Sequence, residues 1–273
     1  MTRARIRRRV IFTVGVVLSA VYAFPFFLVL VNSFKPKVEI LRNPVAFPVE
    51  FSWENFDQAI RKMNYFQALT NSLLVTVFAV TALILVSSML AYFLARTPGR
   101  GWQVSFFVLV ASMIVPFQAL MIPFVGTYGW LVNLSEQASL VFFYIGFGVA
   151  LSTFLYHGFI STIPRELDEA AAIDGATDFV TFWRIIFPML APVTATVAII
   201  NALWIWNDFL LPSLVLSQEN YTLPLSTYLF YGQYSREFGQ AMAGLLLAIV
   251  PIIVFYFFLQ RQIVSGVSAG AVK

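Results

Sequence analysis

Few side chains in the long apolar stretches of this 273-residue sequence have the chemistry of an acid, a base or a nucleophile. Asp208 and His157 are the acid and the base found there, and they stand far apart along the chain. The sequence has one histidine and no cysteine, which excludes a His-rich or thiolate metal site and a cysteine nucleophile. No carboxylate pair and no Gly-x-Ser-x-Gly pattern lies on an apolar stretch. We therefore expect no catalytic residue, no bound metal and no enzymatic activity in this chain.

The elements that must position these residues are predicted to be membrane-spanning helices. Hydrophobic residues make up 60% of the chain and charged residues 11%, which leaves too little polar surface for a soluble core of this size. An apolar helix of about 20 residues crosses the hydrocarbon core of a bilayer. The sequence predicts an all-α polytopic membrane protein with about six such helices, over residues 10–31, 72–95, 102–125, 139–160, 190–214 and 239–259.

Residues 1–273 are interpreted as a single transmembrane domain, whose orientation follows from the basic residues. Lys and Arg are enriched in cytoplasmic loops next to the spans. Eleven of the 17 basic residues precede the first span, follow the second or fourth span, or follow the sixth. Both termini and the loop 161–188 are therefore predicted to be cytoplasmic. The outer loops are then 33–69, expected to be ordered with a short amphipathic helix, and 215–238.

The sequence contains little that would supply energy for transport. No Gly-x-x-x-x-Gly-Lys-[Ser/Thr] loop occurs, so the chain is not predicted to bind ATP itself. An ion-coupled transporter needs ionisable groups within the membrane, and Asp208 and His157 are the ones available. An ion-coupled secondary transporter subunit is therefore the less favoured alternative. If the protein moves a solute uphill, a partner must provide the driving force.

The loop 161–188 is predicted to contain two short helices. Pro164 suits the first turn of a helix, and Ser161 or Thr162 can cap it. Negative charge near the positive end of the helix dipole is stabilising, and three acidic residues follow the proline: Glu166, Asp168 and Glu169. This first helix is therefore expected to begin near Pro164.

A glycine turn is predicted between the two helices. Gly175 is expected to end the first helix, because glycine readily adopts the left-handed conformation at a C-terminus. Thr177 or Asp178 is expected to cap the second helix, which runs to Pro188. One stripe of the first helix has the spacing of a helix face: Leu167, Ala170, Ala171 and Asp174. Such a small-residue face suits docking into a groove of another protein, or packing of an ordinary loop on its own helix ends.

The loop resembles the EAA motif of binding-protein-dependent ABC importer permeases. That motif reads Glu-Ala-Ala, three residues, Gly, nine residues, Ile, one residue, Leu-Pro. Its counterparts here are Glu169, Ala170, Ala171, Gly175, Ile185, Phe187 and Pro188, with Phe187 in place of leucine. In that family the loop is the coupling helix that docks into a cleft of the ATPase subunit. The resemblance implies a coupling role for Glu169, Ala170, Ala171, Asp174, Gly175 and Pro188.

Further segments are similar to the carbohydrate-uptake branch of the family, in particular to the maltose-type G permease subunits. They are Asn32-Ser33-Phe34-Lys35, Asn71-Ser72, Trp206-Asn207-Asp208-Phe209 with Pro212, and the tail from Gln260 to Lys273. Ser265 departs from the basic residue that this tail often carries. The resemblance covers nearly the whole chain and implies the type I ABC importer permease fold.

The resemblance also implies partners and a location. It implies a second, homologous permease subunit, an ATPase subunit dimer that binds ATP and Mg, and an extracytoplasmic solute-binding protein. The chain itself is expected to bind no cofactor and no nucleic acid. Its expected location is the bacterial cytoplasmic (inner) membrane, where it would form half of the pathway for a sugar or related solute.

Two interpretations remain open for the polar residues near the end of the fifth span. Trp204, Asn207 and Asp208 combine an aromatic ring with polar groups, as in a sugar-stacking site on the translocation pathway. Alternatively, they form an interfacial tryptophan belt, with Asp208 bonded to backbone or to the partner permease. The tyrosines of the second outer loop suit either a wet interface with the binding protein or contacts with lipid headgroups: Tyr221, Tyr228, Tyr231 and Tyr234.

Overall fold

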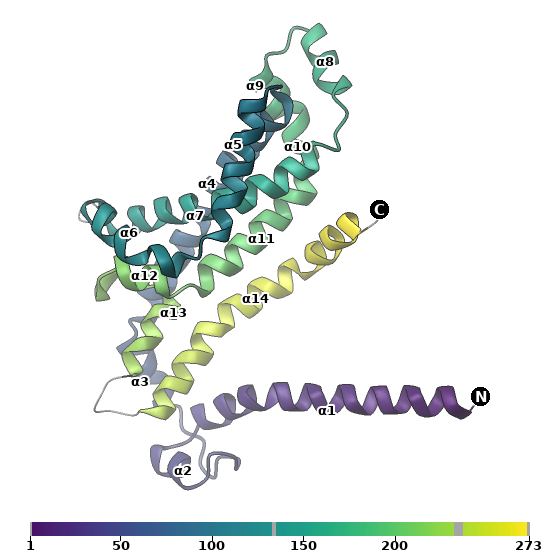
Figure 1. The fold of residues 1–273 in the computed structure, drawn as a ribbon. Helices are drawn as coiled ribbons and strands as arrows, with labels where there is room; N and C mark the ends of the chain where they lie inside the picture. The colour runs from purple at the N-terminus through teal and green to yellow at the C-terminus, as the bar shows by residue number, and fades with distance from the viewer. Residues whose placement is uncertain (1, 133–134, 232–236, 272–273) are drawn as a thin grey trace. The chain divides into compact units, whose positions relative to one another are not determined.

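The computed structural model describes residues 2–132, 135–231 and 237–271, and these are mostly helical (Figure 1). The chain forms two compact units, one of Met1–Phe66 with Ser226–Pro251 and one of Gln67–Leu225 with Ile252–Lys273. Among these described residues, four helices are long and apolar enough to cross a membrane, and the number rises to six if each of two bent helix pairs is one span. The predicted six spans correspond to this upper number.

The first unit contains α1 (Thr2–Ser33), α2 (Lys37–Arg42), α3 (Glu54–Lys62) and the first part of α14 (Phe238–Ala271). α3 is the short amphipathic helix predicted in the loop 33–69, with acidic residues in its first turn and basic residues in its last turn. The loop is shorter than predicted, because α4 begins at Tyr65.

Buried polar side chains order the segment that follows α1. Lys35 is 1% exposed, and its Nζ donates a hydrogen bond to the carbonyl of Asn43 over 3.0 Å. The amide of Asn32 donates to the carbonyl of Pro44 over 2.8 Å, and that of Asn55 donates to the carbonyl of Lys35 over 2.8 Å. These bonds satisfy groups that would be costly to bury unpaired. The loop is therefore ordered, as predicted.

The second unit begins with α4 (Tyr65–Arg96), α5 (Arg100–Ala111), the 3₁₀ turn η1 (Ser112–Ile114), α6 (Phe117–Val132) and α7 (Glu136–Ile160). The predicted span 102–125 is not one helix, since Arg100–Ile114 and Phe117–Trp130 meet at 102°. Pro116 explains the break: it lacks an N–H, and it holds the preceding Val115 in an extended conformation with a ψ of 114°.

The unit continues with α8 (Glu166–Ile173), α9 (Asp178–Thr181), the π-helix η2 (Phe182–Ile186), α10 (Phe187–Met189), α11 (Ala191–Asn207), α12 (Leu210–Val215) and α13 (Leu223–Ser226). The predicted span 190–214 is also divided. α11 ends at Asn207, and the Asp208 carboxylate accepts the amide hydrogen of Leu210 over 3.0 Å. A side chain that bonds nearby backbone in this way competes with helix continuation.

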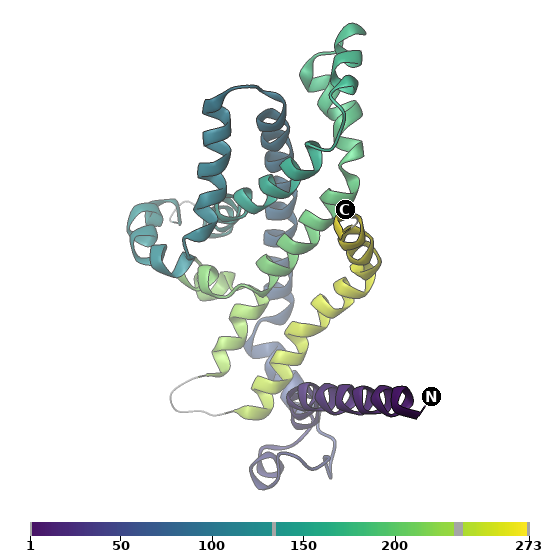
Figure 2. The ribbon, with the colours of Figure 1, turned by 45° about the vertical axis from the view of Figure 1, so that its right-hand side comes forward.

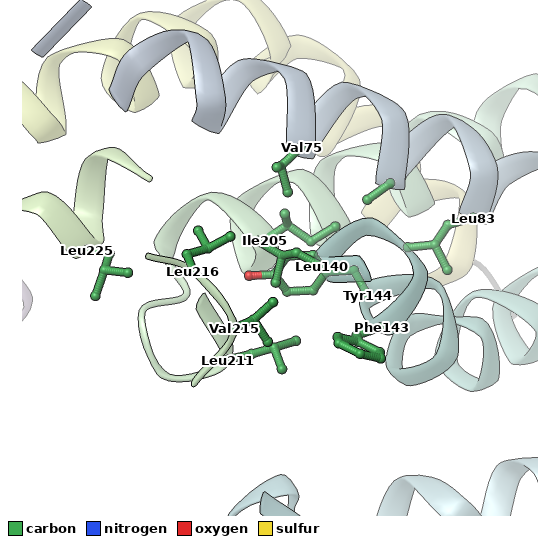
Figure 3. Packing of buried hydrophobic residues seen from close by; sticks show 11 residues of the cluster. Val75, Leu83, Leu140, Phe143, Tyr144, Ile205, Leu211, Val215, Leu216 and Leu225 are labelled. Atoms are coloured by element: carbon green, nitrogen blue, oxygen red, sulfur yellow. The ribbon is translucent and has the colours of Figure 1, made fainter. Parts of the chain in front are cut away.

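Among the residues that the structure describes, two hydrophobic clusters lie in the second unit. The first joins α4, α7, α11 and α12, and Figure 3 shows Tyr144 among its residues. The second lies around Tyr156 and Ile186 and includes Leu167 of α8 at its edge. In both views α8 lies at one end of this unit, away from α6 and α12 (Figure 1 and Figure 2).

Candidate functional site

α8 ends in the glycine turn that the sequence predicts. Gly175 has a φ of +81°, a left-handed conformation that glycine adopts without the strain of a side chain. The amide of Ala176 donates to the carbonyl of Ala171 over 2.9 Å, and the amide of Gly175 donates to that of Ala172 over 3.0 Å. These two bonds are the Schellman pattern, which satisfies the carbonyls at a helix end. The prediction of a helix stop at Gly175 is confirmed.

The start of α8 differs from the prediction. Ser161 and Thr162 do not cap α8, because their hydroxyls donate to the carbonyls of His157 and Phe159 in the last turn of α7. α8 begins at Glu166, and Arg165 precedes it without a side-chain capping bond. These two carbonyls also accept the backbone amide hydrogens of Ser161 and Thr162, so the hydroxyls add a second bond at the end of α7. The three acidic residues do lie in the first turn, as predicted.

The second helix of the loop begins at a threonine cap. Thr177 Oγ1 accepts the amide hydrogen of Val180 over 3.4 Å, which confirms one of the two predicted caps. The helix runs through the π-helical turn to Met189, and it is bent by 76° from α11. Pro188 lies just before this bend and is exposed. The helical end of the loop 161–188 thus leads, through this bend, directly into the fifth predicted span.

The residues of the predicted small-residue face of α8 do not all point the same way: some pack against the rest of the chain and others are exposed. Ala171 is 5% exposed, and Leu167 packs against the second hydrophobic cluster, so this side supports α8 on its own chain. Glu169, Ala170 and Asp174 are exposed. The large apolar side chain of Ile173, also in α8, is 87% exposed. The surface open to a partner is therefore the opposite side of α8, with Ile173 on it.

α8 is attached to the end of α4 through Asp168, which sequence reasoning treated as one of three acids at a helix start. The hydroxyl of Tyr92 donates to Asp168 Oδ1 over 2.6 Å. The Arg96 guanidinium lies 2.9 Å from Asp168 Oδ2. Tyr92 and Arg96 are one helical turn apart, so their spacing places them on one face of α4. A cavity of about 500 Å³ lies beside these three residues and is also lined by Phe179.

The polar residues at the end of α11 have different environments. The Asp208 carboxylate accepts hydrogen bonds from the Leu210 amide and from the Tyr144 hydroxyl, each over 3.0 Å. The Asn207 amide donates to the carbonyl of Leu203 over 2.8 Å in its own helix. Trp204 meets the ring of Tyr144 edge-on at 5.4 Å. The bonds of Asp208 to backbone and to a buried tyrosine favour a structural role for its carboxylate.

A cavity of about 950 Å³ opens where α6, α7 and α11 meet. Trp204, Asn207 and Asp208 line it together, so the structure brings the three predicted pathway residues to one space. Asn201 and Gln118 also line it. Sequence reasoning passed over these two, because a single neutral amide inside an apolar run gives no charge or spacing signal. Asn201 is 2% exposed and donates to Ser152 Oγ over 3.0 Å.

The described residues contain no group of three His, Cys, Asp or Glu side chains placed to hold a metal ion. His157 stacks on the ring of Phe106 at 4.0 Å. The tail from Gln260 continues α14 as far as Ala271. Tyr234, Arg236 and Lys273 lie outside the described residues.

Comparisons with known proteins agree with this arrangement. The family described as "Binding-protein-dependent transport system inner membrane component" matches residues 84–269. The chain is 40% identical to a probable starch degradation products transport system permease protein, AmyC, of Thermoanaerobacterium thermosulfurigenes, and the match covers 100% of both chains. It is 36% identical to the multiple sugar-binding transport system permease protein MsmG of Streptococcus mutans, over 97% of this chain and 95% of that one.

A solved structure shows the same fold. It is that of a bacterial ABC transporter involved in the import of the acidic polysaccharide alginate, with a TM-score of 0.80 and 20% sequence identity. The match covers 96% of this chain and 98% of that chain. Permeases of this kind are multi-pass membrane proteins and are not themselves enzymes. The chain therefore belongs to the family of binding-protein-dependent transport system inner membrane components, as a permease subunit of an ABC importer.

Proposed function

We propose that this permease forms half of the pathway for a sugar or related solute, and that α8 with its glycine turn couples it to an ATPase subunit. The observation that carries the proposal is the exposed side of α8. Ile173 is 87% exposed there, although an isoleucine is usually buried unless a partner covers it. Family membership in a binding-protein-dependent system leaves no reason to retain the ion-coupled alternative.

The coupling surface then consists of an apolar centre with charged neighbours. Phe179 is 64% exposed, so it provides a second exposed apolar side chain in the same loop. Glu169 and Asp174 are exposed, and Ala170 between them leaves the backbone accessible for close approach. Gly175 sets the angle of the turn between α8 and α9. The buried Ala171 packs α8 against its own chain, and Pro188 lies just before the bend that leads into α11. Apolar anchors surrounded by polar residues are typical of protein interfaces.

The cavity of about 950 Å³ is the proposed part of the translocation pathway. Pockets for small molecules have volumes of this order and combine apolar walls with a few polar groups. Trp204 offers a ring face to a sugar, and Asn207 offers an amide. Asp208 would act mainly by holding the end of α11. Relatives are named for starch degradation products and multiple sugars, which supports a carbohydrate as the solute.

The remaining partners follow from the importer type. A second, homologous permease would supply the other half of the pathway, and an ATPase dimer would bind ATP and Mg. A solute-binding protein would contact the outer loop 215–238, where Tyr228 and Tyr231 are 52% and 64% exposed. The chain would lie in the bacterial cytoplasmic membrane with both termini in the cytoplasm, as the basic residues indicate.

The test is ATP hydrolysis by the complex that co-purifies with this chain, with and without its binding protein and candidate sugars. We expect hydrolysis that one sugar-loaded binding protein stimulates. Ile173→Asp should reduce the recovered ATPase about tenfold, because it puts a charge at the centre of the interface. Val38→Asp, at a residue of α2 that is 60% exposed, is the control and should recover normal amounts. Normal recovery with Ile173→Asp, or no co-purified ATPase at all, would disprove the coupling surface.

A further inference from the structure

The contacts between α8 and α4 are more specific than packing requires. Asp168 receives the Tyr92 hydroxyl on one carboxylate oxygen, and the Arg96 guanidinium lies beside the other. The Arg96 and Asp168 side chains are 14% and 20% exposed, so solvent screens this ion pair less than it would a surface pair. Both partners stabilise this mostly buried carboxylate, since loss of a partner from a buried charge is unfavourable.

Two further bonds cross between the same elements in both directions. Arg96 also donates to the carbonyl of Ile163 over 3.1 Å, just before α8. Arg165 in turn donates to the carbonyl of Ala95 over 3.0 Å, in the last turn of α4. Cations near a helix C-terminus are favourable because they meet unpaired carbonyls there. The attachment therefore combines an ion pair, a hydroxyl bond and two bonds to backbone.

Besides the chain connections, this attachment links α8 to a further long helix, α4, so that a displacement of α8 can be transmitted to it. Along the chain, α8 is connected directly to α7 and to α9, whereas Tyr92 and Asp168 are 76 residues apart. Without these contacts, α8 and α4 would be connected by the apolar packing of the second cluster and through the intervening helices. With them, the two elements have to move together.

The opposite end of α4 is bonded to the outer segment 219–223. Gln67 donates to the carbonyl of Glu219 over 2.9 Å, and Asn71 donates to that of Tyr221 over 3.3 Å. Ser72 Oγ accepts the amide hydrogen of Leu223 over 2.7 Å. α4 has 32 residues, a length of about 48 Å at the rise of an α-helix. One helix thus joins the coupling helix to the outer loop.

We propose that Tyr92, Arg96 and Asp168 form a coupling clamp, positioning residues that make α4 move with α8 and transmit that movement to the outer loop 215–238. The inference rests on the coupling role of α8 proposed above. A clamp acts through position alone, so its loss should leave the assembled complex able to hydrolyse ATP. The quantity that should fall is the amount of solute imported per ATP.

The first experiment measures sugar uptake and ATP hydrolysis by the complete importer in proteoliposomes. We expect Asp168→Asn, Arg96→Asp and Tyr92→Phe each to reduce uptake per ATP, by about tenfold for the two charge changes. The ATPase should co-purify normally in all three variants. Asp168→Arg combined with Arg96→Asp should recover a large part of the ratio, because it restores the ion pair in reverse. Asp57→Asn, which breaks an exposed pair with Arg61 on α3, is the matched control and should leave the ratio unchanged.

The second experiment replaces the clamp by a covalent bond. The chain has no cysteine, so a short bifunctional thiol reagent can join only introduced residues within it. Asp168→Cys with Arg96→Cys should import poorly when reduced and recover when cross-linked, if α4 and α8 move as one body. The proposal is wrong if cross-linking blocks import, if the single variants keep the normal ratio, or if they lose the ATPase. Absence of ATP-dependent uptake in the unmodified importer would instead disprove the proposed function itself.

Discussion

Gly175 shows how one backbone conformation places the proposed coupling surface. Its φ of +81° costs an ordinary residue about 1–2 kcal/mol. Space is not the constraint, because a Cβ built there would meet no atom within 4 Å. The restriction at this position is therefore conformational. The turn angle therefore sets the relative positions of Ile173 and Phe179, the two exposed apolar residues of the proposed surface.

Replacement of Gly175 should separate ATP hydrolysis from uptake. Gly175→Val should lower uptake at least tenfold while the chain still inserts, because valine disfavours the left-handed turn by more than 1 kcal/mol. Gly175→Asn should keep more activity, since asparagine tolerates this conformation better than other residues. Radiolabelled sugar uptake and ATP hydrolysis in vesicles measure both effects. Equal uptake by the valine and glycine forms would show that the turn angle has no part in coupling.

Tyr144 should stabilise the end of α11 through its bond to Asp208. Tyr144→Phe removes the donor to one carboxylate oxygen in a buried setting, at a cost of about 1–3 kcal/mol. We expect a lower midpoint of thermal unfolding for the purified complex. Tyr128→Phe is a suitable control, because the Tyr128 hydroxyl makes no hydrogen bond within the described residues and its ring is 40% exposed. An unchanged midpoint in Tyr144→Phe would argue against a structural role for Asp208.

At the scale of elements, α4, α7 and α11 meet at a position that admits only glycine. A Cβ on Gly148 of α7 would lie 2.8 Å from Leu83 Cδ1 and 3.1 Å from Asn201 Oδ1. Leu83 is fully buried, so it has little room to move aside. Close approach of small residues is a common means of packing membrane helices. Gly148 therefore sets how closely the three helices approach one another, and it also forms part of the wall of the larger cavity.

Gly148→Ala should destabilise this packing by about 1–3 kcal/mol, the usual cost of overfilling a core. The measurement is thermal unfolding of the purified complex, followed by uptake at a permissive temperature. Gly158→Ala on the same helix is the control, because a Cβ there would meet no atom within 4 Å. If both variants unfold at the same temperature, helix packing at Gly148 is looser than the structure indicates.

At the scale of the whole molecule, the predicted topology is open to a direct test. α8 and α12 lie at opposite ends of the second unit, as expected if the loop 161–188 and the end of α11 face different sides of the membrane (Figure 1). Because the chain lacks cysteine, single cysteines report on their own sites. Gln218→Cys should react with a membrane-impermeant thiol reagent in intact spheroplasts. Thr162→Cys should react only in inverted vesicles, and the reverse pattern would contradict the orientation.

The sequence by itself determined the class of the protein, the glycine turn and a helix cap at Thr177 or Asp178, of which the structure has Thr177. These features depend on composition or on residues close together in the chain. An excess of apolar residues needs lipid as solvent, and a left-handed turn needs glycine. The EAA spacing marked the proposed coupling loop for the same reason, since its residues lie close together in the chain, between Glu169 and Pro188.

Only the tertiary structure decided which side of α8 faces outward and what holds it. Asp168 meets Tyr92 and Arg96 across 76 and 72 residues of chain, a distance over which local spacing carries no information. The same holds for Asn201 and Gln118, which join Trp204 in one cavity. The division of the third span at Pro116 and of the fifth at Asp208 also needed the structure. A proline or an acid inside an apolar run is compatible with a kink or a full break, and packing of the neighbouring helices selects between them.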